Sequence, residues 1–387
     1  MKVLHAFNAP RSGGGSLAAS RASIAVLRAH GVEVEVFSRD SRNLPQGLAG
    51  RIQAGLSAFY PREAVRDFDR VLGQFQPDLV HINELFPLVS PWVLRACRAA
   101  GIPVVMTVDD YHLTCPVRNH FRDGQVCTQC LGGPLGGREY QAVLNNCRGN
   151  LAENLVNAGY SAMVRALGLY TGQVDHFIAP SAFSARWVVE QVGVAAERVS
   201  VVPHTIDIPA TAADAAAGSY FAFGGRFVPE KGIAVLLAAA RRSNLPVKLS
   251  RNVQHFVTID VPPEVEVVVT QGRDDLAAFY RGARALVLPS IWFESFGIVG
   301  AESMSHGIPI VASRLGAVAD LVEDGVDGLL FTAGDAADLA DKADRLWRDP
   351  GLAAQMGQRA RAKAQALWSG DAHHAQLMAV YAKAAAH

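Results

Sequence analysis

The sequence predicts an α/β protein with two doubly wound parallel sheets that carry helices on both faces. Two observations predict this class. Short apolar runs alternate with longer stretches of helical period along most of the chain, as in parallel strands joined by helices. In addition, 387 residues are more than one hydrophobic core usually organises, which favours two domains.

The first domain is expected to span residues 1–203. Its helical runs 16–31 and 91–101 each end on a glycine, which is typical of a helix C-terminus. Its strand candidates are short runs of apolar and β-branched residues. They are residues 2–7, 32–38, 78–83, 103–109, 176–181 and 199–203.

The pattern changes after Pro203, where residues 204–218 are rich in Ala, Thr and Pro and are expected to link two domains. Strands and helices alternate again in the second domain, residues 219–368. Residues 369–387 are expected to form a C-terminal helix. The strand candidates of the second domain are SYFAFGG, PVKLS, VEVVVT, RALVLPS, IPIVAS and GLLFT.

Composition and charge exclude several classes of protein. The chain carries 36 basic and 36 acidic side chains, so its zero net charge gives no case for nucleic acid as a partner. No apolar run approaches the ~20 residues needed to span a bilayer. The apolar run at the N-terminus is too short for a secretory signal. We therefore expect a cytoplasmic protein with reduced cysteines.

The loop GGRFVPEKG, residues 224–232, lies between a strand candidate and a helical run. Its backbone amides, the positive end of the following helix, and the side chains of Arg226 and Lys231 suit an anion the size of a diphosphate. A solvated loop in which Glu230 and Lys231 cap the helix is an equally good interpretation of the loop alone.

The glycine-rich run RSGGGS, residues 11–16, has the same placement in the first domain. Consecutive glycines let a backbone approach a ligand closely, but the spacing is not that of a dinucleotide fingerprint. A plain turn is the simpler interpretation of this run by itself. Two such loops, one in each domain, favour a ligand more than either does alone.

The stretch FESFGIVGAES, residues 293–303, places two carboxylates on either side of a predicted helix start. Glu294 precedes the first turn, and Glu302 lies one to two turns into the helix, so the two side chains point in different directions. Hydroxyl groups of one ligand could donate to both. Glu302 could instead be a surface residue, but its neighbours are apolar, and a buried carboxylate needs partners.

These motifs, GGRFVPEKG, PSIWFESFGIVGAESMSHGIPIVAS and GAVADLVEDGVDGLLF, resemble glycosyltransferase family 4. Its members are retaining, nucleotide-sugar-dependent enzymes with the GT-B fold, two Rossmann-like domains that face a cleft. The spacing Glu294-x7-Glu302 is similar to the family's paired glutamates. The likeness covers most of the chain, because the glycine-rich N-terminal loop and TVDDYHLTCP also have counterparts.

The resemblance implies a role for each matching position. Arg226 and Lys231 would hold the donor diphosphate and stabilise the leaving group, so no catalytic metal is expected. Glu302 would accept hydrogen bonds from the ribose, and Glu294 would orient the donor sugar. The amides that would help to orient it belong to Phe296, Gly297 and Ile298. Gly14 and Gly15 would let the N-terminal loop close over the phosphates.

The implied reaction moves a hexose from a nucleoside diphosphate sugar to an acceptor hydroxyl with retention of configuration. A same-face route and a double displacement both remain open. The acceptor could be a glycan, a lipid-linked sugar or a small molecule, in surface polysaccharide or glycoconjugate synthesis. A lipid-linked acceptor would bring the first domain into peripheral contact with the inner membrane face, through residues 154–170, although an amphipathic core helix explains that segment equally well. The fold also implies that the C-terminal helix crosses back to the first domain.

Two positions depart from the family pattern. Asp109 stands where the family usually has a catalytic histidine, and an ionised carboxylate accepts hydrogen bonds but cannot donate them. The change is consistent with a different donor sugar, a different acceptor geometry, or lost activity. Residues 251–260 replace a glycine-containing loop beside the nucleobase, which leaves the base open. A nucleotide-sugar epimerase and an inactive nucleotide-sugar-binding protein are therefore alternatives.

A cysteine-rich insertion is expected at about residues 111–150 of the first domain. It contains a Cys-x2-Cys pair with one further cysteine on each side, a spacing that suits tetrahedral zinc. The four candidate ligands are Cys115, Cys127, Cys130 and Cys147. Metal binding is favoured over reduced thiols or a redox pair. A structural zinc fits best, because four thiolates leave no open position for chemistry. Cys97 is expected in the core.

Overall fold

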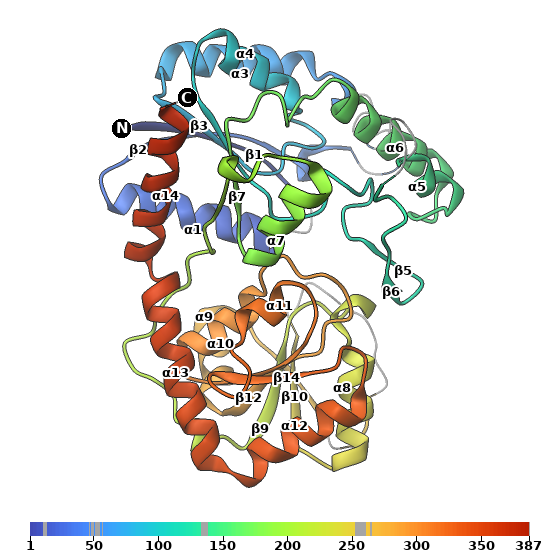
Figure 1. Cartoon of the computed structure of the whole chain (residues 1–387), viewed down its shortest axis with the longest axis vertical. Helices are drawn as coiled ribbons and strands as arrows, with labels where there is room; N and C mark the ends of the chain where they lie inside the picture. Colours follow the sequence, from blue (N-terminus) through green and yellow to red (C-terminus); the bar gives the residue numbers. More distant parts are fainter. Residues whose placement is uncertain are drawn as a thin grey trace. The chain divides into compact units, whose positions relative to one another are not determined.

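The chain divides into two compact units, each described here by itself. The computed structural model describes residues 1–10, 14–45, 47, 50, 55, 57–132, 138–251, 261–263 and 265–386. The first unit contains Met1–His120, Cys127–Thr205 and Gly370–His387, and the second contains Phe121–Val126 and Ile206–Ser369. Each unit is built around one parallel sheet with helices packed on it (Figure 1).

The sheet of the first unit has the order β2-β1-β3-β4-β7-β8, and all its neighbouring strands are parallel. The strand order reverses between β1 and β3, which makes this the switch point of the sheet. Strands β3, β4 and β7 are buried along their whole length, as expected for a sheet covered on both faces. The strands are β1 (Lys2–Ala9), β2 (Glu33–Asp40), β3 (Leu79–Ile82), β4 (Val104–Thr107), β7 (His176–Ala179) and β8 (Val199–Val201).

Alternation along the strands gives this sheet two separate apolar faces. In β1, Val3 packs in the cluster that contains Ile24 of α1, whereas its neighbour Leu4 packs in the cluster that contains Phe68 of α3. The helices are α1 (Gly15–Ala29), α3 (Arg62–Phe75), α4 (Leu94–Ala99), α5 (Tyr140–Leu144), α6 (Leu151–Ala166) and α7 (Ala182–Trp187). A π-helical turn (Val188–Val192) follows α7, and single 3₁₀ turns occupy Ser41–Asn43, Pro91–Val93 and Ala196–Arg198.

The sheet of the second unit has the order β11-β10-β9-β12-β13-β14, again all parallel. Numbered within the unit this is the order 3-2-1-4-5-6, with its switch point between β9 and β12. The strands are β9 (Tyr220–Gly224), β10 (Val247–Arg251), β11 (Val265–Val269), β12 (Ala283–Leu288), β13 (Ile310–Ser313) and β14 (Gly328–Phe331). The two sheets confirm the predicted α/β class and its doubly wound parallel architecture.

The helices of the second unit pack in pairs, α8 with α12 and α10 with α13. They are α8 (Ile233–Ser243), α9 (Arg273–Arg281), α10 (Ile298–Ser305), α11 (Gly316–Leu321), α12 (Ala336–Arg348) and α13 (Pro350–Trp368), with 3₁₀ turns at Ala215–Ala217 and Pro229–Lys231. The segment 206–218 belongs to this unit and contributes Ile206 and Ala215 to its core. Among the described residues, no helix is both long and apolar enough to cross a bilayer.

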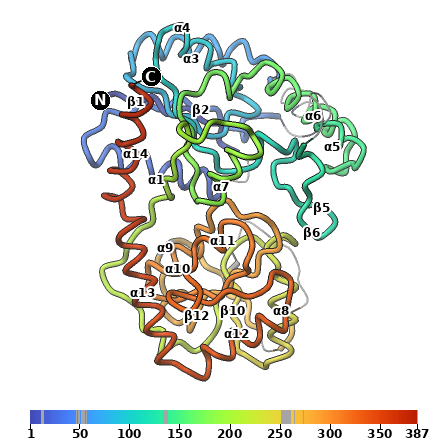
Figure 2. The backbone as a smooth tube through the Cα atoms, in the orientation of Figure 1, coloured from blue at the N-terminus to red at the C-terminus, as the bar shows by residue number. Residues whose placement is uncertain are grey.

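The helix α14 (Gly370–Ala385) is part of the first unit, where it lies beside α1 (Figure 2). Nδ1 of His373 lies 2.8 Å from the carbonyl oxygen of Pro203, so it donates to that oxygen, and Nε2 accepts from the Ser23 hydroxyl at 3.0 Å. Further along the helix, the Tyr381 hydroxyl lies 2.7 Å from Nδ1 of His81 on β3. Burial lowers the pKa of His373 to about 4, so this ring is neutral at neutral pH.

The extended backbone of Ser369 (ψ 159°) separates α13 from α14. One feature of the fold differs from the sequence prediction. A two-stranded antiparallel hairpin, β5 (Phe121–Arg122) and β6 (Gln125–Val126), was not expected. Its turn residues Asp123 and Gly124 both have positive φ, so an Asp-Gly hairpin signal was present in the sequence.

Candidate functional site

The predicted donor-binding residues of the second unit lie on two loops that leave neighbouring strands at the switch point. One loop follows β9 and carries Arg226 and Lys231, and the other follows β12 and carries Glu294. The loops are joined by a hydrogen bond in which the Ile291 amide donates to the Glu230 carbonyl oxygen at 3.0 Å. Ligands of open α/β sheets bind at this position, outside the carboxyl ends of the strands.

The structure brings Lys231 and Glu294 together as an ion pair, with Nζ 2.6 Å from Oε1. The Ser290 hydroxyl donates to the same oxygen at 2.7 Å, and the Lys231 ammonium also lies 5.4 Å from the centre of the Trp292 ring. Burial alone would raise the pKa of Glu294, but the charge and hydrogen bond of Lys231 and the Ser290 hydroxyl hold that pKa below its usual value. Glu294 is therefore an ionised, buried carboxylate.

Arg226 pairs with a different residue. Its guanidinium lies 3.7 Å from the Glu230 carboxylate, and 52% of its side chain is exposed. An exposed pair of this kind holds its partners weakly, so the guanidinium can exchange Glu230 for a phosphate. The structure thus places one partly buried cation, Lys231, and one exposed cation, Arg226, on the same loop.

The helix α10 begins between the two predicted carboxylates, Glu294 and Glu302. Gly297, with a φ of 95°, is its N-cap, and no side chain caps the backbone amides of its first turn. Phe296 is buried and packs edge-on against Trp368. Glu302 lies in the second turn, where its Oε2 accepts from the Tyr280 hydroxyl at 3.0 Å. Glu302 and Glu294 therefore have separate partners, as their spacing predicts.

Gly232 fixes the distance between the two loops, because a Cβ at this position would lie 1.7 Å from the Pro289 carbonyl oxygen. We expect Gly232→Ala to lower the free energy of unfolding by roughly 4 kcal/mol, from steric overlap and from its φ of 69°. The control is Gly334→Ala, which has a φ of 84° but open space around it, and should cost about 1 kcal/mol. Calorimetric unfolding of both variants measures the difference. Equal losses would contradict the close approach.

Asp109 lies in the first unit, at the carboxyl end of β4, within a set of polar groups from three other segments. Its Oδ2 accepts from the Ser16 hydroxyl at 2.7 Å and from the Asn83 side-chain amide at 3.3 Å. Its Oδ1 lies 3.3 Å from Nε2 of His204. Burial lowers the pKa of His204, while the Asp109 charge opposes that shift. Gly14, with a φ of 135°, immediately precedes the helix that carries Ser16.

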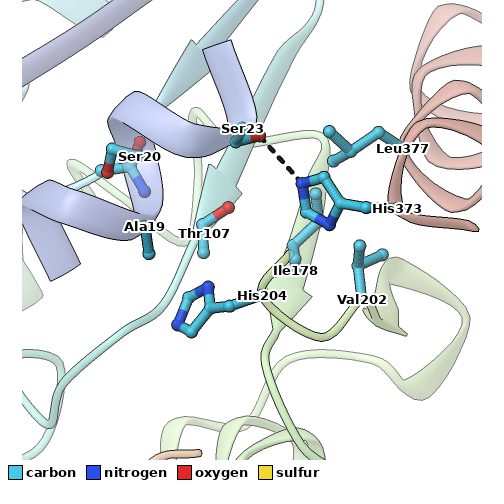
Figure 3. A pocket seen from close by; sticks show the side chains of 10 residues that line it. Ala19, Ser20, Ser23, Thr107, Ile178, Val202, His204, His373 and Leu377 are labelled. Carbon is cyan, nitrogen blue, oxygen red and sulfur yellow. Dashed lines mark hydrogen bonds between the residues drawn. The ribbon is translucent and has the colours of Figure 1, made fainter. Parts of the chain in front are cut away.

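A small polar cavity of about 20 Å³ adjoins this set in the first unit (Figure 3). Thr107, Ser20 and His204 line it, together with Ser23 and His373, whose hydrogen bond closes one side. This volume suits one water molecule, which needs two to four polar partners. The sequence prediction missed Ser16, Asn83 and His204. Their one signal was position, since each follows a strand of the first domain.

A second buried network was also missed by the sequence prediction. Arg118 pairs with Glu84, and Asp110 bonds to both the backbone amide and Nδ1 of His112. Burial alone would lower the pKa of His112, but Asp110 and Glu84 raise it above its usual value. His112 therefore binds Asp110 and does not take the place of the histidine that Asp109 replaces. Among the described residues, Glu84, Asp110 and His112 form the one group of three ligand atoms within 4.8 Å of one another, but Arg118 already supplies a cation there.

Residues 11–13 and 252–260, which include most of the RSGGGS run and of the expected nucleobase loop, lie outside the described residues. Gly14 and Gly15 belong to the first unit, and the other predicted donor-binding residues belong to the second. The four cysteines Cys115, Cys127, Cys130 and Cys147 all belong to the first unit, and none of the four forms a disulfide.

Two families match the sequence. Glycosyltransferase Family 4 matches residues 21–209, and Glycosyl transferases group 1 matches residues 215–363. The D-inositol 3-phosphate glycosyltransferase of Nocardiopsis dassonvillei is 30% identical over 392 residues, which cover 88% of this chain and 83% of that protein. The chain belongs to glycosyltransferase family 4. This membership confirms the resemblance inferred from the motifs. It also confirms the predicted enzyme class, glycosyltransferase.

Other family 4 relatives match over part of their length. An uncharacterized glycosyltransferase of Methanocaldococcus jannaschii is 30% identical over 36% of this chain and 41% of that protein. For the D-inositol 3-phosphate glycosyltransferase of Pseudarthrobacter chlorophenolicus, the values are 31% identity, 49% of this chain and 51% of that protein. The chain thus matches about half the length of these two relatives.

Solved structures share the fold of this family 4 chain. Sucrose-phosphate synthase of Thermosynechococcus elongatus superposes with a TM-score of 0.69 at 22% identity, over 99% of this chain and 98% of that one. Anabaena HepE in complex with UDP-glucose superposes with a TM-score of 0.65 at 20% identity, over 99% of both chains. The predicted GT-B fold is confirmed.

Proposed function

We propose that this chain is a retaining glycosyltransferase that moves a hexose from a nucleoside diphosphate sugar to an acceptor hydroxyl. The observation that carries the proposal is the Lys231–Glu294 ion pair at the switch point of the second unit, in which the carboxylate is buried and the ammonium is partly exposed. An ammonium group has three donors, so Lys231 can bond to Glu294 and still donate to phosphate oxygens. The cation would stabilise the charge that develops on the departing diphosphate.

The remaining donor contacts follow from the same geometry. Arg226 would leave Glu230 and bind a phosphate oxygen, and the first-turn amides of α10 would face the sugar or the phosphates. Glu302 would accept from the ribose hydroxyls while its other oxygen keeps the Tyr280 bond. Fixed cations and a helix terminus can replace a catalytic metal in this arrangement. In the first unit, Asp109 would accept a hydrogen bond from a hydroxyl group of the substrate.

A panel of nucleoside diphosphate sugars tests the reaction. UDP-glucose is the first donor to try, because Anabaena HepE is similar in fold and binds it. D-inositol 3-phosphate is the first acceptor, because the Nocardiopsis relative is named for it. Release of nucleoside diphosphate with an α-linked product from an α-linked donor supports retaining transfer. A new sugar isomer without release would indicate an epimerase, and heat stabilisation with neither would indicate a binding protein.

The role of Glu302 is tested by donor affinity. We expect Glu302→Ala to weaken nucleoside diphosphate binding about 30-fold, because a charged acceptor of ribose hydroxyls contributes roughly 2 kcal/mol. Tyr280→Phe is the matched control, since it removes the hydroxyl that bonds to Glu302 but keeps the carboxylate. Its affinity should stay within a few-fold of the parent. If Glu302→Ala and Lys231→Ala both bind every donor as tightly as the parent, the site assignment is wrong.

The acceptor and the setting are further parts of the proposal. Family frequency favours surface polysaccharide or glycoconjugate synthesis. A lipid-linked acceptor would bring the first unit to the inner membrane face, and α6 exposes Leu151 and Leu155 one turn apart. Binding of the protein to vesicles of anionic and neutral lipids, measured by sedimentation, tests this part separately from donor turnover.

A further inference from the structure

The four cysteines of the insertion have no role in the proposed donor site. They come from separate places in the first unit: Cys115 lies after β4, Cys127 follows the hairpin, and Cys147 precedes α6. The thiols of Cys115 and Cys130 are hydrogen-bonded to one another. The Asn145 side-chain amide donates to Oε1 of Gln129 at 2.8 Å, which holds the segment that ends at Cys147 beside the loop that carries Cys127 and Cys130. The fold therefore brings together the three segments that carry the four cysteines.

Local backbone turns fix the positions of Cys115 and Cys127. The Arg118 amide donates to the Cys115 carbonyl oxygen at 2.9 Å, which closes a turn directly after that cysteine. The Cys127 amide donates to the His120 carbonyl oxygen at 2.7 Å, which closes the base of the hairpin. Cys127 and Cys130 then stand two residues apart, the spacing with which one loop supplies two ligands to a tetrahedral ion.

His120, the one histidine between Cys115 and Cys147, is already hydrogen-bonded through its ring. Its Nδ1 lies 2.8 Å from the Cys127 carbonyl oxygen and its Nε2 lies 2.9 Å from the Thr114 hydroxyl, so both ring nitrogens of His120 have partners. Cys97 lies elsewhere, on α4, where its thiol donates to the Val93 carbonyl oxygen at 3.8 Å. The ligand set is therefore four thiols and no imidazole.

We propose that Cys115, Cys127, Cys130 and Cys147 bind one structural Zn²⁺. Within the described residues, no three of the four sulfur atoms lie within 4.8 Å of one another, so binding must draw Cys127 and Cys147 onto the Cys115–Cys130 pair. Each thiol loses its proton on binding, which leaves the complex with a charge of about −2. Arg148 lies close enough to Cys115 to interact with its charge and would offset part of this excess.

The ion would have a structural role. Four thiolates close the tetrahedral shell, so no position is left for substrate or water. The metal would join the segment after β4, the base of the β5–β6 hairpin and the turn before α6, which the described residues connect only by hydrogen bonds and packing. The proposal does not rest on the proposed transfer reaction.

Metal analysis of the full chain, purified without chelator, is the direct test. We expect about one zinc per chain, and fewer than about half would overturn the proposal. Cys130→Ser and Cys147→Ser should each lose the zinc, whereas the control Cys97→Ser should keep it. Because a cysteine variant could fail to fold, the parent protein is also tested with Co²⁺ after mild chelation. Tetrahedral thiolate ligation gives intense visible absorption, and weak absorption typical of oxygen ligands would count against four thiolates.

Two further measurements separate zinc from cysteine redox chemistry. Thiol titration of the native protein should find the four cysteines protected, and a strong chelator should expose them and lower the unfolding temperature. A Cys115–Cys130 disulfide in protein purified under reducing conditions, found by mass spectrometry of non-reduced peptides, would overturn the proposal in favour of a redox pair.

Discussion

Replacing Lys231 by methionine is expected to lower kcat/KM for the nucleotide-sugar donor about 1000-fold. The physical reason is the loss of a fixed cation beside the departing diphosphate, a term worth about 4 kcal/mol in a site of this kind. The same change leaves Glu294 buried without its partner at 2.6 Å. We therefore also expect the free energy of unfolding to fall by roughly 3 kcal/mol at neutral pH. Steady-state kinetics and denaturant unfolding measure the two effects.

The double variant Lys231→Met with Glu294→Gln separates stability from catalysis. It removes both charges, so most of the lost stability should return while kcat/KM stays low. The control Lys248→Met breaks an ion pair at 2.8 Å with Glu266, whose side chain is 58% exposed, and should change neither quantity much. Turnover of Lys231→Met within about tenfold of the parent would exclude the proposed role.

The Lys231–Glu294 pair also gives a dependence on pH. In the folded protein the pKa of Glu294 lies below its usual value, so the pair stabilises the fold above the usual carboxyl pKa. That stabilisation is lost as the pH falls through the lowered pKa. In Lys231→Met, burial is no longer opposed by the ammonium, so the carboxyl should take up a proton at a higher pH than in the parent.

Replacing Asp109 by alanine is expected to lower kcat/KM about 100-fold, or about 2.7 kcal/mol. Alanine removes an acceptor that is oriented by Ser16 and Asn83. Asp109→Asn keeps an acceptor oxygen of the same shape and should lose less than about tenfold, if the role is to accept a substrate hydroxyl. A much larger loss in Asp109→Asn would show that the charge itself is needed. Kinetics with a series of donor sugars measures both variants.

The control for Asp109 is Asp175, a carboxylate just before β7 that contacts the opposite end of β4. Asp175 accepts from the Val104 amide at 2.7 Å, at the amino end of β4, whereas Asp109 follows its carboxyl end. Asp175→Asn should therefore affect stability and leave turnover unchanged. If Asp109→Ala turns over the donor as fast as the parent, Asp109 takes no part in the reaction.

Much of the second unit could be predicted because its signals are local. Most of its strands are apolar runs, and the four site residues lie within short stretches next to strand ends, namely Arg226, Lys231, Glu294 and Glu302. Because the switch point follows from strand order, loops after β9 and β12 meet whatever their detailed sequence. The choice of ion-pair partners was less predictable from the sequence. Lys231 pairs with Glu294, and Arg226 pairs with Glu230.

The first unit was less predictable because its contacts join distant segments. Ser16 reaches Asp109 from the start of α1, and Asn83 and His204 reach it from two loops. No spacing in the sequence relates these residues. The Asp110–His112 bond joins residues that are close in sequence. Its effect on the pKa of His112, however, also depends on burial beside Glu84 and Arg118, which the sequence does not reveal. The hairpin at 121–126 was missed because strands of two residues carry no periodicity.

The place of α14 has a consequence for the order in which the protein folds during synthesis. The first unit needs His373 and Tyr381 to cover Ser23 and His81, but these two residues follow the whole of the second unit in the chain. The second unit can close its core as soon as Ser369 has been made. The sheet that starts at Lys2 must wait until α14 emerges, because α1 alone covers only part of one apolar face. A nascent chain should therefore acquire protease resistance in its second half first.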